Sequence, residues 1–168
     1  KSELAIGQYL AGTTRNVIWT ARSSSPVVTV FPVASDGSVL AGTNYSLAYA
    51  TKPLQQIQGA TAAAFKGNPG RPESLVLGDT GTDRIYLVKV LAQAGGQATL
   101  AVATGWQTGV KPERFAVGDL TGDEIPEVVA LCTTSRMLHV LNGTTNGPST
   151  TLQQVLGGPA QDLALLDF

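Results

Sequence analysis

The sequence contains little charge and no strongly basic segment. Lys and Arg number 11 and Asp and Glu 12, so the formal net charge is −1 and charged residues make up 14% of the 168 residues, against about 25% in an average soluble domain. Nucleic-acid binding is not expected, because contacts to phosphates need a cluster of Lys and Arg. No apolar run approaches the roughly 20 residues that cross a bilayer, so we expect no direct membrane insertion.

Cysteine and histidine each occur once, as Cys132 and His139. One cysteine excludes an intrachain disulfide, and one histidine without a cysteine pair excludes an ordinary zinc site. Cys132 ends an apolar run at 128–132, where we expect a small buried side chain. His139 lies in a second run at 137–141, where we expect a partly exposed or hydrogen-bonded strand histidine. The chain has no Gly-x-Ser-x-Gly elbow either, so we expect no catalytic activity.

A pattern about fifty residues long recurs along the chain. Pro72-Glu73 and Pro126-Glu127 each open an apolar run, and each run is followed by a polar turn and a second apolar run. An earlier copy begins near residue 4, and residues 163–168 resemble the start of another. The pattern predicts three units and the first strand of a fourth, at residues 4–60, 61–112, 113–160 and 162–168.

Each unit contains short runs rich in β-branched and aromatic residues, separated by Gly, Ser, Thr, Asn and Pro. Four strands in forty to fifty residues, repeated, are typical of the blades of a β-propeller. We expect inner-strand structure at 62–64, and fourth strands of the units at 45–50, 98–103 and 151–156. A β-sandwich is the alternative, although it has no reason to repeat its loops at a fixed period.

Residues 115–129 read Phe-Ala-Val-Gly-Asp-Leu-Thr-Gly-Asp-Glu-Ile-Pro-Glu-Val-Val. This stretch resembles the FG-GAP or VCBS repeat of integrin α-subunit propellers and many bacterial surface proteins. In that family an inner strand runs into a loop of alternating oxygen ligands and then into a second strand. Degenerate copies at 8–19 and 65–77 extend the resemblance over the chain. The resemblance implies an extracellular or cell-surface propeller that binds calcium.

The expected Ca2+ ligands lie at alternate positions of this loop. Asp119, Thr121, Asp123 and Glu127 occupy side-chain positions one, three, five and nine, and Ile125 would offer its backbone carbonyl at position seven. Calcium takes six to eight oxygen ligands at about 2.3–2.6 Å, and alternate residues can turn their oxygens toward one centre.

Two positions depart from the family pattern. Thr121 stands where an acid or amide is usual, and Glu124 stands where glycine is usual, so Glu124 must accept a backbone geometry that suits glycine. The alternative to a metal site is a turn in which Asp119 and Asp123 bind backbone amides. The equivalent ligand positions of the other units are held by Phe65, Pro69, Gln8 and Gly12.

Other polar and aromatic residues receive structural interpretations. Asp79 and Asp83 flank a Gly-Thr turn, where Asp is favoured for its bonds to the backbone. Trp19 lies among apolar residues and is expected in the core. Trp106 lies in a looser polar segment, where it either stacks on a sugar ring or packs against a neighbouring blade.

Together these features predict a non-catalytic calcium-binding β-propeller module that serves adhesion, scaffolding or recognition of a protein or glycan ligand. The alternative is a fragment of a polysaccharide-active enzyme such as a lyase, whose catalytic residues lie elsewhere. Propellers usually need about four to eight blades to close. We therefore expect an oligomer, or the remainder of a longer chain, to complete the ring.

Overall fold

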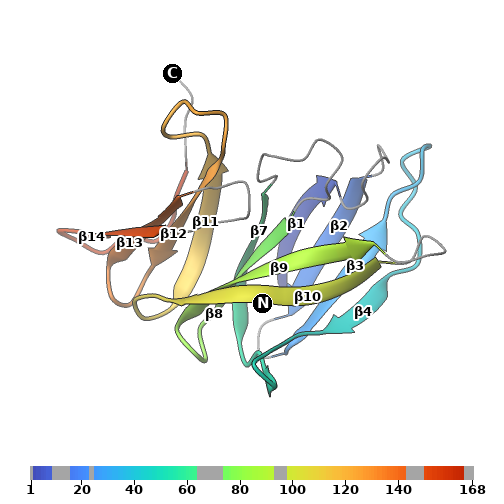
Figure 1. Ribbon diagram of the computed structural model, residues 1–168, viewed down its shortest axis with the longest axis horizontal. Coiled ribbons are helices and arrows are strands. Elements are labelled where there is room, and N and C mark those ends of the chain that lie inside the picture. Colours follow the sequence, from blue (N-terminus) through green and yellow to red (C-terminus); the bar gives the residue numbers. More distant parts are fainter. Residues whose placement is uncertain are drawn as a thin grey trace.

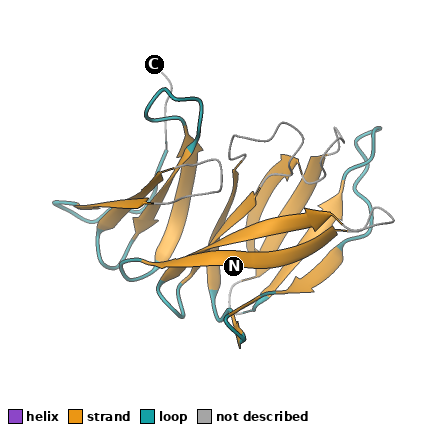
Figure 2. Ribbon diagram, in the orientation of Figure 1, coloured by secondary structure: helices purple, strands orange, loops and turns teal. Residues whose placement is uncertain are grey.

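The computed structural model is built of β-strands joined by turns and loops (Figures 1 and 2). The structure describes residues 2–8, 16–22, 25–63, 74–92, 98–142 and 150–164. These residues contain no helix, and their strands form several four-stranded antiparallel sheets. The prediction of an all-β chain is therefore confirmed.

The strands form their sheets in chain order. The first sheet contains β1 (Ser2–Gln8), β2 (Asn16–Arg22), β3 (Val27–Pro32) and β4 (Thr43–Ser46). The second contains β7 (Ile57–Ala63), β8 (Ser74–Asp79), β9 (Arg84–Ala92) and β10 (Ala98–Gln107). The third contains β11 (Pro112–Gly118), β12 (Glu127–Cys132), β13 (Met137–Asn142) and β14 (Thr150–Val155). A short ribbon pairs β5 (Ala48–Tyr49) with β6 (Lys52–Pro53).

The second sheet is covered on both faces, because it lies between the other two. One face joins the first sheet in a cluster that we call the first core, which includes Trp19, Val28, Val30, Leu75, Leu77, Tyr86 and Val88. The other face joins the third sheet in the second core, which consists of Val76, Ile85, Leu87, Val128, Ala130 and Leu141. Burial on both sides explains why β8 and β12 are continuous apolar runs without polar alternation.

The first strands of the three sheets lie next to one another, since β7 contacts both β1 and β11. The second and third sheets approach closely beside Gly78 of β8. A methyl group at Gly78 would overlap the carbonyl oxygen of Pro112 and lie 3.0 Å from the ring of Phe115. Glycine is therefore needed here for the close approach of two backbones. The closure of these sheets as propeller blades stays a prediction.

The β8–β9 and β12–β13 hairpins have turns of the same kind. The last turn residue is left-handed in both, with φ of 52° at Asp83 and 56° at Arg136. In both, the first turn residue donates its amide to the segment that leads into the sheet. These bonds run from Thr80 to the carbonyl of Gln56 at 2.8 Å and from Thr133 to that of Lys111 at 3.1 Å. Each hairpin thus holds the linker that enters its own sheet.

Several local predictions are confirmed. Trp19 is 1% exposed in the first core, and Cys132 is fully buried at the end of β12. The strands expected at 98–103 and 151–156 correspond to β10 and β14, although β10 continues to Gln107. Ala62 and Ala63 lie in β7, so strand structure is confirmed for them, while Ala64 lies outside the described residues.

The single strand expected at 45–50 is wrong. Strand β4 ends at Ser46, and Leu47 turns into the first core, where it is 2% exposed. Ala50 and Thr51 then have φ of 48° and 68°, and they form the turn between β5 and β6. The strand expected at 45–50 is therefore interrupted at Leu47, which enters the core, and ends before the left-handed turn at Ala50 and Thr51.

The start of the fourth unit, expected at 162–168, is described only in part. Residues 162–164 lie outside any strand, and residues 165–168 are outside the described part of the chain. The carboxylate of Asp162 lies 3.9 Å from Nε of Arg114 in β11, so this segment returns beside the first strand of the third sheet.

Candidate metal site in the loop between β11 and β12

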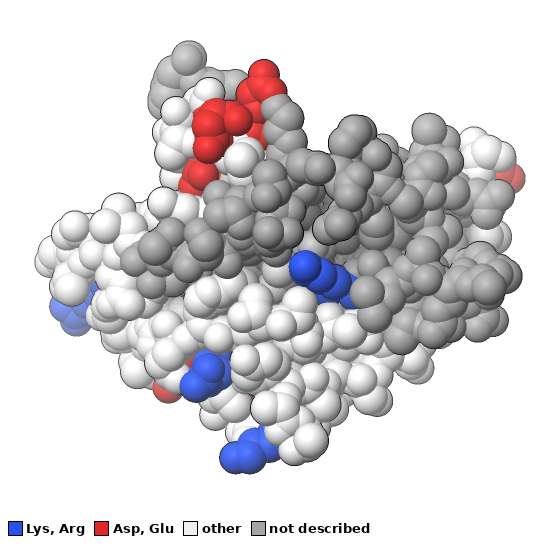
Figure 3. Space-filling model, in the orientation of Figure 1, with Lys and Arg blue, Asp and Glu red and all other residues white. Residues whose placement is uncertain are grey.

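The loop that was expected to bind calcium projects beyond the end of β11 (Figure 1). It comprises residues 119–126, and Glu127 opens β12 immediately after it. Asp119, Asp123 and Glu124 are exposed, and acidic side chains gather on this projection at the top of Figure 3. The loop therefore offers a concentrated negative charge in a chain with little charge elsewhere.

Asp119 folds the loop around its own carboxylate. Its Oδ1 accepts the amides of Gly122 at 2.7 Å and Asp123 at 3.2 Å, and its Oδ2 accepts the amide of Glu124 at 2.7 Å. Three consecutive backbone donors therefore point at one side chain. This geometry is the amide-binding turn that was the alternative to a metal site.

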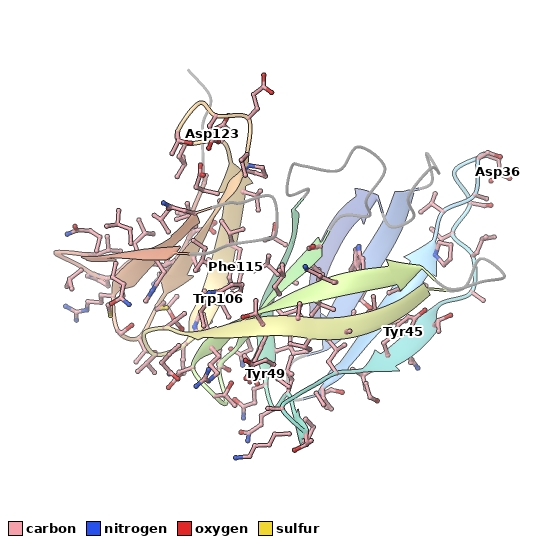
Figure 4. The ribbon with its side chains drawn as sticks, in the orientation of Figure 1. Asp36, Tyr45, Tyr49, Trp106, Phe115 and Asp123 are labelled. Atoms are coloured by element: carbon pink, nitrogen blue, oxygen red, sulfur yellow. The ribbon has the colours of Figure 1, made fainter. Side chains whose placement is uncertain are left out.

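The other two carboxylates also accept backbone amides. Asp123 Oδ1 accepts the amide of Ile125 at 2.9 Å, so it shapes the second half of the loop (Figure 4). Glu127 Oε2 accepts the amide of Leu120 at 2.7 Å, and its side chain is only 2% exposed. Glu127 therefore ties the base of the loop to the start of β12.

Glu124 adopts the backbone geometry that the sequence predicted, with φ of 63°. Gly122, two residues earlier, has φ of 76°. Left-handed geometry suits glycine and strains other residues by about 1–2 kcal/mol. The loop keeps this strain at Glu124 because Asp119 holds the amide of that residue.

We expect Glu124→Gly to raise the free energy of unfolding by up to about 1 kcal/mol, because glycine adopts this φ without strain but gains entropy when unfolded. Urea unfolding without added metal measures this change. Glu124→Ala is the control, since it removes the side chain and keeps the strain. Equal stability of the two variants would show that the gain does not come from relief of backbone strain at residue 124.

The oxygen donors fit calcium chemically, but they are not gathered around one centre. Among the described residues, no group of three or more His, Cys, Asp or Glu side chains is placed to hold a metal ion. Thr121 is exposed and Ile125 is half-buried in the same loop. A carboxylate oxygen that accepts an amide keeps a second lone pair that can bind a cation. A calcium site here would need Asp119, Asp123 and Glu127 to converge.

The equivalent loops of the first two units cannot be compared with this one. Their ligand positions were assigned to Gln8, Gly12, Phe65 and Pro69. Gly12, Phe65 and Pro69 lie outside the described residues, and only the backbone of Gln8, at the end of β1, is described.

Asp79 binds the backbone of its turn, as predicted, whereas Oδ1 of Asp83 accepts the amide of Lys111 at 3.1 Å, outside the turn. Asp79 is fully buried and accepts the amide of Gly81 at 3.0 Å within the turn. It also accepts the amides of Gln55 at 2.9 Å and Gln56 at 2.8 Å, from the segment leading into β7. Asp79 thus joins a hairpin to a linker, a role for which the sequence gives no signal beyond the turn itself.

Trp106 packs against the second core, half-buried near the end of β10. It pairs with Ile85 across the strands, and the second core that it packs against also includes Val128, Ala130 and Leu141 of the third sheet (Figure 4). This position agrees with packing against a neighbouring sheet, which was one of its two interpretations. Stacking on a sugar ring stays a prediction.

His139 is fully buried in β13, and its Nε2 accepts the amide of Gly109 at 2.9 Å. The hydrogen-bonded interpretation of this residue is therefore confirmed. Burial lowers the pKa of the imidazole below its ordinary value. Burial also raises the pKa of the Cys132 thiol.

Comparison with known proteins adds no family assignment. No family model matches the chain, and a search of curated proteins gives no match. The described residues include no helix long and apolar enough to cross a membrane.

Proposed function

We propose that the chain is a non-catalytic calcium-binding β-propeller module of the FG-GAP or VCBS kind, which recognises a protein or glycan ligand at the cell surface or outside the cell. The observation that carries the proposal is the loop after β11, where Asp119, Asp123 and Glu127 stand at every fourth position from the end of β11 to the first residue of β12. Oxygen donors of this kind are those that calcium prefers.

The arrangement of the sheets supports the propeller part of the proposal. Each sheet runs in chain order from its first strand outward, and the first strands are neighbours. In a propeller, successive four-stranded sheets surround a central axis in this way. The remaining blades would come from an oligomer or from the remainder of a longer chain.

In the loop, Asp119, Asp123 and Glu127 would supply carboxylate oxygens, Thr121 its hydroxyl and Ile125 its carbonyl. The ion would neutralise the negative charge that these residues bring together and hold the loop in one shape. Since the other units lack the acids at these positions, the ion would act as a structural support for one loop. Recognition would then use the loops between strands, which carry function in most scaffolds.

We expect calcium to raise the melting temperature by several degrees, since a hundredfold excess over the dissociation constant stabilises the folded state by about 2.7 kcal/mol. Thermal melts in calcium and in excess chelator measure the difference. Asp123→Ala should abolish it. Asp36→Ala is the matched control, because Asp36 accepts the amide of Ser38 at 2.9 Å in a distant exposed loop and should keep the calcium response (Figure 4).

A melting temperature that is equal in calcium and chelator would show that residues 119–127 form only an amide-binding turn. A calcium response that survives in Asp123→Ala would show that calcium acts elsewhere. Either result would remove the metal from the proposal.

A further inference from the structure

We propose that His139 is a pH-sensitive latch that holds the linker between the second and third sheets and releases it in acid. The linker comprises residues 108–111, between the end of β10 and the start of β11. It is the covalent connection between the two sheets, and His139 lies in the third of them. This inference does not depend on calcium binding or on a ligand.

The hydrogen bond from Gly109 fixes the protonation state of the histidine. Nε2 of His139 accepts the Gly109 amide at 2.9 Å, so the neutral imidazole carries its proton on Nδ1. Within the described residues, Nδ1 is buried and has no hydrogen-bond partner. A second proton could only go to Nε2, where it would face the N–H of Gly109. Two donors cannot share this contact, so protonation must break it.

The linker has little room to adjust while the contact is kept. A methyl group at Gly109 would overlap the hydroxyl of Ser135 and lie 3.0 Å from Sδ of Met137. The backbone of the linker is therefore pressed against the third sheet at the end of β12 and the start of β13. Protonation of His139 would therefore have to separate the linker from this surface, because neither the imidazole nor the Gly109 amide can turn away inside the packed site.

Among the described residues, no carboxylate forms an ion pair with His139, so an imidazolium there would have no counter-ion. Asp83 on the β8–β9 turn uses Oδ1 to accept the amide of Lys111 at 3.1 Å, and Glu113 on β11 uses Oε2 to accept the hydroxyl of Thr133 at 2.6 Å. The elements packed around the linker also carry the thiol of Cys132 on β12 and two exposed basic residues, Lys111 on the linker and Arg136 on the β12–β13 turn. Desolvation is the cause that lowers the pKa of His139.

The direction of the pH effect follows from this environment. The folded chain disfavours the charged imidazole, so the unfolded chain binds the proton more readily below the ordinary pKa of 6.5. Stability is therefore complete above pH 6.5 and falls as the pH drops below it. The unfolding equilibrium constant should rise by up to about tenfold per pH unit in this range.

Urea unfolding at pH 7.5 and pH 5.5 tests the latch in the whole chain, with His139→Gln as the matched variant. Glutamine can accept the Gly109 amide through Oε1 and does not titrate. His139 is the one histidine in the sequence, so subtracting the variant isolates its contribution. We expect the unfolding constant of the wild type to rise up to about tenfold more than that of the variant. An equal rise in both would overturn the proposal.

A second measurement keeps the test decisive if His139→Gln fails to fold. An NMR titration of the wild type follows Cε1–H of His139 and the amide of Gly109. A histidine pKa below 6.5, with the Gly109 amide shifting in the same titration, would support the latch. A pKa at or above 6.5, or a Gly109 amide that does not respond, would overturn it.

Discussion

Gly78→Ala is expected to lower the free energy of unfolding by about 3 kcal/mol, because overpacked interiors lose about 1–3 kcal/mol and the clash here is with backbone. The added methyl would overlap the carbonyl oxygen of Pro112 and press on the ring of Phe115 at 3.0 Å. A flexible side chain could move away, but the Pro112 carbonyl belongs to the first strand of the next sheet. The second and third sheets would have to separate.

The sign of the stability change separates two effects of a glycine-to-alanine substitution: steric overlap in the folded state and lower entropy of the unfolded chain. Glycine to alanine at a strain-free position stabilises by about 0.4–1 kcal/mol, since it restricts the unfolded chain. Gly157→Ala supplies that comparison, because nothing lies within 4 Å of a methyl at Gly157. Urea unfolding of both variants should therefore give opposite signs or a difference of several kcal/mol. Similar stability of the two would show that the sheets do not approach closely at Gly78.

The sequence predicts those features of the fold that depend on neighbours along the chain. The apolar runs of β8 and β12 are readable because both of their faces are buried, and Cys132 ends the second of these runs. Trp19 is readable as a core residue from its apolar neighbours in β2. The amide-binding turn around Asp119 is also local, since each of its donors lies within five residues.

Features that depend on the packing of one sheet against another are not readable in this way. Gly78 resembles a turn glycine in the sequence, yet it lies within β8 and meets Pro112 of the next sheet. Leu47 interrupts an apparent strand because the first core offers it a buried position. The hydrogen bond from Gly109 to His139 likewise depends on how the linker packs against the third sheet.

In the candidate site, too, local features are predictable from the sequence and features that depend on tertiary structure are not. The sequence predicts the acidic loop and the left-handed Glu124. It gives no indication that Glu127 would be buried and bonded to Leu120. Whether the carboxylates converge depends on their side-chain rotamers and on an ion, and neither is specified by spacing alone. The calcium melts therefore test the part of the site that the local pattern leaves open.

Asp79→Ala is the second variant with a large expected effect, a loss of about 3–4 kcal/mol in the free energy of unfolding. The carboxylate is fully buried and accepts the amides of Gln55, Gln56 and Gly81 at 2.8–3.0 Å. Removing it leaves three backbone donors unsatisfied, and each buried donor without a partner costs about 1–3 kcal/mol. Since these amides are only partly buried, water can hydrogen-bond to them in the variant. The expected loss is therefore close to about 1 kcal/mol for each of the three donors, the lower end of the range.

Asp79→Asn separates the acceptor role from the carboxylate charge. Asparagine keeps one oxygen acceptor but places an NH2 group toward another backbone donor, so its stability should lie between those of the wild type and Asp79→Ala. Asp36→Ala is the control: Asp36 makes a similar bond to the amide of Ser38 in an exposed loop, and its loss should change stability little. Thermal and urea unfolding measure all three variants. If Asp79→Ala matches Asp36→Ala, the Asp79 carboxylate does not hold the linker to the β8–β9 hairpin, and the bond from the Thr80 amide to the Gln56 carbonyl must do so.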